Sequence, residues 1–265
     1  MKLVESILTQ NPCYRDGRKI TVTGLMLHSV GCPQPSAEVF IRAWNKPDYR
    51  DSCVHAIIDG RNATIYQTLP WDHRGWHCGG SGNNGYIGVE MCEPGCIKYT
   101  SGSKFTCSDL PTAQAVATRT YYAAVELFAD LCEKFDLDPT GYGVILSHSE
   151  GFKRGIASGH ADPEHLWQGL DLPFTMESFR LAVQEKLIRR VLDSTPAPWA
   201  KEGVEWAVAN GILLGDGMGD LMLHSPVTRE QVCVMLKRYH DLGNKPGSGS
   251  GYKPGFINPA ITCAV

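Results

Sequence analysis

The chain has 265 residues, of which 43% are hydrophobic, and it carries a formal net charge of -3 at pH 7. Its isoelectric point lies near 6.3. A chain of this length favours one sizeable core with a small second module. Proteins that wrap nucleic acid usually present a strongly basic face, so this charge balance argues against nucleic acid as a partner and leaves room only for a local basic patch.

The N-terminal segment, Met1 to Gln10, does not have the pattern of a secretory signal, and no apolar run is long enough for a membrane span. We therefore expect cytoplasmic synthesis and no membrane partner. The ten cysteines include no C-x-x-C pair. The nearest spacing, Cys92-x-x-x-Cys96, fits either a structural metal site or, as we prefer, thiols that are buried or partly exposed.

The first predicted elements are a strand and a helix. Gly24 to Val30 is a short apolar run that predicts a buried strand with His28 near its end. Residues 36–44 predict a helix, because Ser36 can cap it and apolar side chains recur along one face. The strand therefore delivers a histidine to the loop that follows it.

Three more strands are predicted next. Residues 54–58 and 64–69 predict two strands, and the Asp-Gly turn between them is typical of an antiparallel hairpin. Residues 86–91 predict another strand, and the glycine-rich stretch 79–85 before it predicts a loop. Glu90 interrupts the apolar character of that strand.

The later part of the first domain combines helices with one more strand. Residues 112–135 carry apolar side chains at helical spacing, and residues 176–192 predict a final amphipathic helix. Residues 144–147 predict a strand that ends at His148. Strands and helices mixed in this way predict an α/β fold, with a mixed central β-sheet flanked by helices.

The chain is expected to divide after the last of these helices. The stretch 193–198 contains two prolines and predicts a boundary. We expect a catalytic domain over residues 1–193, a small helical C-terminal module over residues 194–243, and a flexible tail over residues 244–265, where Gly-Ser repeats indicate a linker.

Titratable side chains concentrate in residues 147–167, which contain three histidines and an aspartate. A catalytic zinc ion needs three protein ligands and one open position for water. Two histidines at strand ends and one loop carboxylate meet that need, and His28, His148 and Asp162 supply them. The alternative is that each is a satisfied structural side chain, but the clustering favours a metal site.

At these residues the sequence resembles the type-2 N-acetylmuramoyl-L-alanine amidases, a family that includes phage endolysins, bacterial autolysins and the fold of peptidoglycan recognition proteins. The resemblance covers roughly Gly24 to Trp167. It rests on the motifs LMLHS (25–29), CVHAIIDG (53–60), RGWHCGG (74–80), IGVEMCEP (87–94) and SHSEG…GIASGHADPEHLW (147–167).

The resemblance implies a role for each site residue. His28, His148 and Asp162 would be the zinc ligands, and Glu90 would be the general base that accepts a proton from water. His160, two positions before the third ligand, would stabilise the oxyanion or orient the site. The implied reaction is hydrolysis of the amide between N-acetylmuramic acid and the L-alanine of the stem peptide in bacterial peptidoglycan.

Other aromatic residues receive weaker predictions. His55 and His77 match family positions near the substrate cleft, where either would contact substrate or, as readily, orient and pack around the site. His165 is expected to be mostly structural. Trp71 and Trp76 would either stack against substrate or belong to the core.

The C-terminal module looks like one S-layer-homology motif, on the pattern WA…NGI…GDG followed by TRE at 228–230. The resemblance implies binding to wall polysaccharide, and self-association into a homodimer is an alternative role. An amidase of this kind without an export signal suggests a phage or prophage endolysin that reaches the wall after holin-type release. A bacterial autolysin, a non-catalytic peptidoglycan receptor and a zinc hydrolase of some other amide are the competing interpretations.

Overall fold

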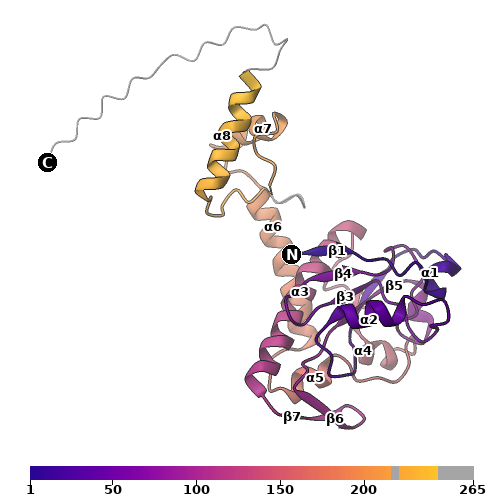
Figure 1. Ribbon diagram of the computed structural model, residues 1–265. Coiled ribbons are helices and arrows are strands. Elements are labelled where there is room, and N and C mark those ends of the chain that lie inside the picture. The colour runs from indigo at the N-terminus through magenta and orange to yellow at the C-terminus, as the bar shows by residue number, and fades with distance from the viewer. Residues whose placement is uncertain (216–220, 244–265) are drawn as a thin grey trace. The chain divides into compact units, whose positions relative to one another are not determined.

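The computed structural model describes residues 1–215 and 221–243 (Figure 1). The predicted tail at 244–265 and most of the predicted loop at 215–220 lie outside the described residues. The strands are β1 (Leu3–Glu5), β2 (Gly24–Ser29), β3 (Ala56–Ile58), β4 (Ile65–Gln67), β5 (Tyr86–Met91), β6 (Ile97–Ser101), β7 (Lys104–Cys107) and β8 (Ile145–Ser147). The helices are α1 (Pro12–Asp16), α2 (Ala37–Trp44), η1 (Ser81–Asn84, a 3-10 turn), α3 (Leu110–Phe135), α4 (His148–Lys153), α5 (Glu164–Gly169), α6 (Met176–Ser194), α7 (Lys201–Ala209) and α8 (Arg229–Gly243).

Six strands form one mixed sheet in the order β1-β4-β3-β5-β2-β8. The β3–β4 pair is antiparallel, as its Asp-Gly turn predicts, and every other neighbouring pair in this sheet is parallel. Helices flank the sheet, so the predicted mixed α/β fold is confirmed. β6 and β7 form a separate antiparallel hairpin.

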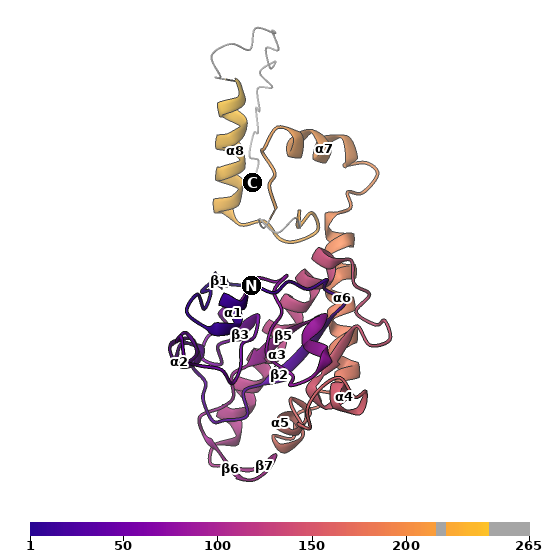
Figure 2. The ribbon, with the colours of Figure 1, turned by 90° about the vertical axis from the view of Figure 1, so that its right-hand side faces the viewer.

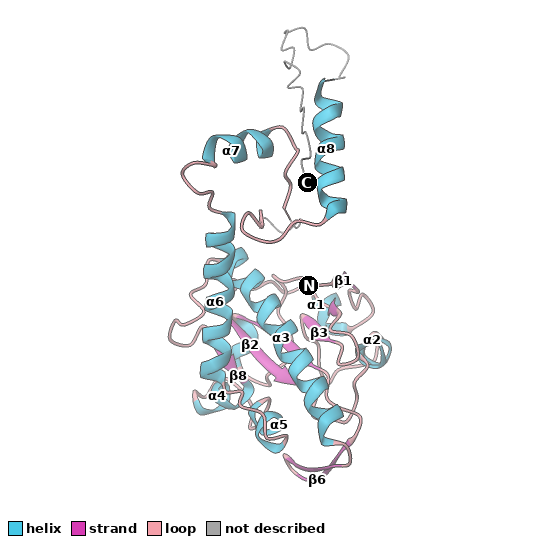
Figure 3. Ribbon diagram, turned by 90° about the vertical axis from the view of Figure 1, so that its left-hand side faces the viewer, coloured by secondary structure: helices cyan, strands magenta, loops and turns pink. Residues whose placement is uncertain are grey.

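Helices α3 and α6 cover one face of the sheet (Figure 3). Side chains alternate between the two faces of a strand, and Leu25, Leu27 and Val89 point to the face that these helices cover. They meet Phe128 of α3 and Phe179 of α6, both fully buried. This layer is the main core.

The same alternation sends the intervening side chains to the opposite face. There α1 and α2 pack over one half of the sheet, where Trp44 and Ile57 belong to a second core. On β2 and β5, His28 and Glu90 each directly follow a position whose side chain faces α3 and α6. Their own side chains therefore face the opposite side of the sheet. These two predicted site residues therefore lie on the same face as the second core, near the carboxyl ends of β2 and β5, and neither of them belongs to that core.

The start of helix α3 and the hairpin β6–β7 differ from the sequence prediction. Helix α3 begins at Leu110 rather than at residue 112, because the Asp109 side chain accepts the backbone N–H of Thr112 and caps it. The hairpin β6–β7 was not predicted, although Ile97 and Tyr99 alternate with polar residues. It lies beside α5 (Figures 1 and 2) and shares a third small core with it.

The chain divides into two compact units, and the boundary lies between Arg189 and Arg190. In the second unit, the described residues form α7 and α8, and Arg238 of α8 donates to the backbone carbonyl of Ile212 at 3.1 Å. The module limits proposed from the sequence stay a prediction. No helix among the described residues is long and apolar enough to cross a membrane.

Candidate metal centre and active site

His28 is the last but one residue of β2, the strand that lies between β5 and β8. It is buried, with 1% of its surface exposed. His28 pairs with Glu90 of β5, and the three residues before it pair with both β5 and β8, so the backbone that carries this imidazole is firmly held. A ligand on such an element is held more precisely than one on a loop.

His148 begins helix α4 directly after β8, so the predicted strand end is also a helix start. Ser147 and Glu150 form a capping box, in which each side chain accepts the other's backbone N–H at 3.0 Å. Arg180 of α6 binds the Glu150 carboxylate through two hydrogen bonds of 2.9 and 3.0 Å. This local structure fixes the first turn of α4, and with it the buried His148.

Asp162 lies in the loop between α4 and α5, where its Oδ2 accepts the backbone N–H of Ser29 at 3.3 Å. Burial by itself would lower the pKa of His28 and raise that of Asp162. Their mutual hydrogen bond and charges, together with the charge of Glu90 acting on His28 and that of His148 acting on Asp162, overcome burial, so the pKa of His28 is raised and that of Asp162 is lowered. A positive charge beside Asp162 is thus favoured, and a metal cation would supply it.

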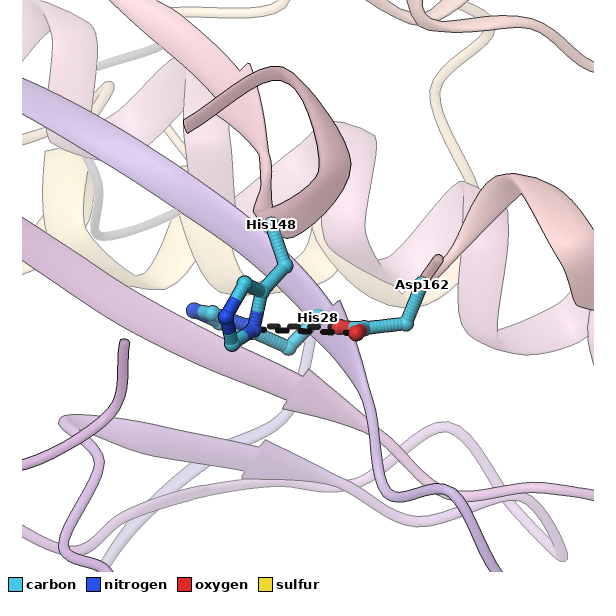
Figure 4. Close-up of side chains that lie close together, drawn as sticks. All are labelled: His28, His148 and Asp162. Atoms are coloured by element: carbon cyan, nitrogen blue, oxygen red, sulfur yellow. Dashed lines mark hydrogen bonds and ion pairs between the residues drawn. The ribbon is translucent and has the colours of Figure 1, made fainter. Parts of the chain in front are cut away.

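The three side chains converge from different elements (Figure 4). Nδ1 of His28 lies 3.0 Å from Nδ1 of His148 and 3.3 Å from Oδ2 of Asp162, and Nδ1 of His148 lies 3.6 Å from Oδ1 of Asp162. Tetrahedral zinc with ligands at about 2.0–2.1 Å places neighbouring ligand atoms roughly 3.3 Å apart. Spacing and donor types therefore fit zinc.

Among the described residues, His28, His148 and Asp162 are the group whose ligand atoms lie close enough together to share a metal ion. Cys92 and Cys96 do not belong to such a group. Burial, followed by the charge of His28, lowers the pKa of His148 to about 4, which keeps that imidazole neutral at pH 7. A neutral imidazole is the form that binds a metal. The structure thus brings together the three residues that the sequence predicts as ligands.

Glu90 lies opposite His28 in the β5–β2 register and lines the cavity in front of the three ligands. Its Oε2 is buried without a hydrogen-bond partner in the described part of the chain. Burial, offset in part by the charge of His28, raises the pKa of Glu90 to about 8. A carboxyl group with a pKa near neutrality is suited to exchange protons with a reacting water.

His160 lies at the exposed rim of the same cavity. Its Nδ1 is 3.2 Å from Nε2 of His148 and 3.1 Å from Oγ of Ser158, and its ring centroid is 4.4 Å from that of His148. The imidazole therefore borders the centre through its contact with His148. Its predicted contact with an oxyanion stays a prediction.

His55 and His77, which were predicted to lie near the substrate cleft, differ in what they contact. His77 has its Nδ1 3.0 Å from Nε2 of His28, so it contacts a candidate ligand directly. His55 contacts backbone instead, with the N–H of Gly88 donating to its Nδ1 and its Nε2 facing the carbonyl of His73. Burial, reinforced by neighbouring imidazoles, lowers the pKa of His77 well below its usual value.

A cavity of about 890 Å³ opens in front of the centre. Trp71 packs against the main core, and Trp76 packs against the second core and also lines the cavity, so both belong to the core and stacking of Trp76 against substrate stays a prediction. Tyr99 and His165 also line the cavity; sequence reasoning missed Tyr99 and expected His165 to be mostly structural. Tyr99 belongs to the hairpin that was not predicted, so its alternating pattern was the available indication.

Tyr99 and His165 join the walls of this cavity to the metal-ligand segments. The Tyr99 hydroxyl donates to Oε2 of buried Glu93 at 2.8 Å, so Nε2 of His165, also at 2.8 Å, must donate to that hydroxyl. Oε1 of Glu93 accepts from Oγ of Ser29 at 2.7 Å and from the N–H of Gly31 at 3.0 Å. The network therefore ties the hairpin to the chain that follows His28.

Known proteins resemble this chain in sequence and in fold. A family model described as N-acetylmuramoyl-L-alanine amidase matches residues 17–165. The chain is 27% identical over 126 residues to the N-acetylmuramoyl-L-alanine amidase CwlH of Bacillus subtilis (strain 168), which covers 45% of this chain and 46% of CwlH. It thus spans about half the length of that relative. A crystal structure of the Staphylococcus aureus hydrolase AmiA in complex with its ligand has a similar fold, with a TM-score of 0.53 and 22% identity over 71% of this chain and 84% of AmiA.

Proposed function

The chain belongs to the N-acetylmuramoyl-L-alanine amidase family, and from this membership we propose that it is a zinc-dependent peptidoglycan hydrolase. The bond cleaved is the amide between N-acetylmuramic acid and the L-alanine of the stem peptide. The observation that carries the proposal is the convergence of His28, His148 and Asp162 at zinc-ligand spacing in front of a cavity. Glu90, which lines that cavity, supplies the acid–base group that hydrolysis requires.

The ligands would be Nδ1 of His28, Nδ1 of His148 and a carboxylate oxygen of Asp162. When bound, zinc supplies Lewis-acid chemistry, since it makes water nucleophilic near neutral pH and polarises a carbonyl. Glu90 accepts the proton of the attacking water and returns it to the amine nitrogen as the C–N bond breaks. His160 donates a hydrogen bond toward the carbonyl oxygen as negative charge develops there.

Finer assignments rest on sequence patterns and stay predictions. The S-layer-homology resemblance supports wall polysaccharide as the target of the C-terminal module, with self-association as the alternative. The sequence also supports a phage or prophage endolysin over a bacterial autolysin. A non-catalytic peptidoglycan receptor would need the same cavity but would cut no bond.

The test combines metal analysis with product analysis. Zinc content is measured for the wild type, His28→Ala and Glu90→Ala, and new amino and reducing ends are counted on digested peptidoglycan. We expect about one zinc per chain, new L-alanine amino ends and no new reducing ends from the wild type. Both variants should be inactive, and only His28→Ala should lose zinc. Zinc without cleavage would favour the receptor, and no zinc would refute the proposal.

A further inference from the structure

His77 lies in the loop between β4 and β5 and contacts His28 on the side away from Asp162. Its Nδ1 is 3.0 Å from Nε2 of His28, and its Nε2 is 3.0 Å from the backbone carbonyl oxygen of Tyr86. The His28 and His77 rings meet edge to face, with centroids 5.2 Å apart. Two imidazoles and one carbonyl group thus form a continuous chain of hydrogen bonds.

The direction of these hydrogen bonds follows from the carbonyl end. A carbonyl oxygen only accepts, so Nε2 of His77 carries the proton. A neutral imidazole has one N–H, so Nδ1 of His77 accepts, and Nε2 of His28 must be its donor. Nδ1 of His28 must lose the proton that it shares with Asp162 before it can bind a metal, and neutral His28 then keeps its single proton on Nε2, with the lone pair of Nδ1 directed at His148 and Asp162.

We propose that His77 is a positioning residue that holds His28 in the tautomer whose Nδ1 is free to bind zinc. The inference rests on the proposed zinc-dependent function of the same site. Metal-binding histidines usually donate their second N–H to a carboxylate, a carbonyl or water, and such partners fix both the tautomer and the ring orientation. Here another imidazole accepts that proton.

The surroundings of His77 fix its ring in turn. The side-chain Oδ1 of Asn83 accepts the backbone N–H groups of His77 and Cys78, at 2.9 and 3.2 Å. Gly88 on β5 leaves the space that the ring occupies, because a Cβ there would lie 2.3 Å from Cγ of His77. The loop and the strand therefore position the acceptor nitrogen independently of any metal.

The test uses two substitutions that differ in one group. His77→Asn places an amide oxygen near the position of Nδ1, so it can still accept from His28, whereas His77→Leu fills similar space without an acceptor. Zinc dissociation constants are measured by competition with a chromophoric chelator. We expect His77→Leu to bind zinc about 10–100-fold more weakly than the wild type, and His77→Asn to recover most of that loss.

A second readout reports the tautomer itself. Two-bond ¹H–¹⁵N correlation spectra of zinc-free protein, recorded at a pH high enough for His28 to be neutral, distinguish protonated from unprotonated ring nitrogens. In the wild type and in His77→Asn, His28 should show its proton on Nε2, and in His77→Leu both tautomers should appear. His55→Leu is the matched control, since His55 is also a buried histidine but hydrogen-bonds only to backbone; it should leave zinc affinity and the His28 tautomer unchanged.

Two results would overturn the inference. One is wild-type zinc affinity in His77→Leu, and the other is a His28 tautomer that does not respond to that substitution. If the wild type bound no zinc, the proposed function would fail, and the zinc-free spectra would still decide the role of His77. Thermal unfolding of all variants with chelator present shows whether any loss of affinity reflects loss of the fold.

Discussion

His28 and Glu90 are partners in register on the parallel strands β2 and β5. Since side chains alternate along a strand, equal register places both on the same face of the sheet, away from α3 and α6. Neighbouring strands lie about 4.8 Å apart, so the sheet itself fixes the separation between a candidate ligand and the candidate base. No loop has to close for the two to meet.

Glu90→Gln should abolish most activity while zinc stays bound. The amide keeps the size of the carboxyl group but cannot accept a proton, and loss of general base catalysis costs typically about 10²- to 10⁴-fold in rate. Stability near neutral pH should change little, because the buried carboxylate oxygen that is replaced has no hydrogen-bond partner in the described structure. Kinetics on peptidoglycan with zinc analysis tests this. Full activity would remove Glu90 from the mechanism.

Removal of zinc should destabilise the protein. The three ligands come from β2, α4 and the loop before α5, so they meet only in the folded chain, and a ligand that binds only the folded state adds about 2.7 kcal/mol at one hundred times its dissociation constant. Thermal unfolding with and without a chelator should show a clear downward shift for the wild type. His28→Ala serves as the control and should show no shift on chelation; an equal shift would place the metal elsewhere.

Gly88→Ala should disturb the site from the far side of His77. The added methyl group would lie 2.3 Å from Cγ and 2.6 Å from Nδ1 of His77, so that ring must shift, which disturbs its contact with His28. We expect a loss of about 1–3 kcal/mol in stability from overpacking, together with weaker zinc binding. At Gly95 the nearest atom to an added methyl group is 3.5 Å away, so Gly95→Ala is the matched control. Equal zinc affinity in both variants would contradict this.

His55 should make the fold sensitive to mild acid. Burial lowers its pKa from 6.5 to about 4, so below pH 6.5 the unfolded chain binds a proton that the folded chain does not. Through this group the free energy of unfolding keeps its full value above pH 6.5 and falls by about 3 kcal/mol as the pH decreases to 4. Urea unfolding with chelator from pH 7.5 to 4 should show a shallower decline for His55→Gln than for the wild type. Parallel curves would show that His55 does not titrate in this range.

The sequence alone determined much of the local structure of the site. Alternation and apolar runs locate β2, β5 and β8, and clustering singles out His28, His148 and Asp162 as candidates. These features depend on near neighbours in the chain, because strand periodicity and capping are set by a few adjacent residues. The same local pattern was present in β6–β7, where Ile97 and Tyr99 alternate with polar side chains.

Only the tertiary structure decided which side chains meet. His28 and His77 are 49 positions apart, and Tyr99 and His165 are 66 apart, yet each pair is within hydrogen-bond distance. Such contacts follow from the order of strands in the sheet and from how loops pack over its edge, and neither leaves a periodic trace in the sequence. Hydrogen-bond direction, and with it the tautomer of His28, is fixed by the backbone carbonyl of Tyr86, which no side-chain pattern can indicate.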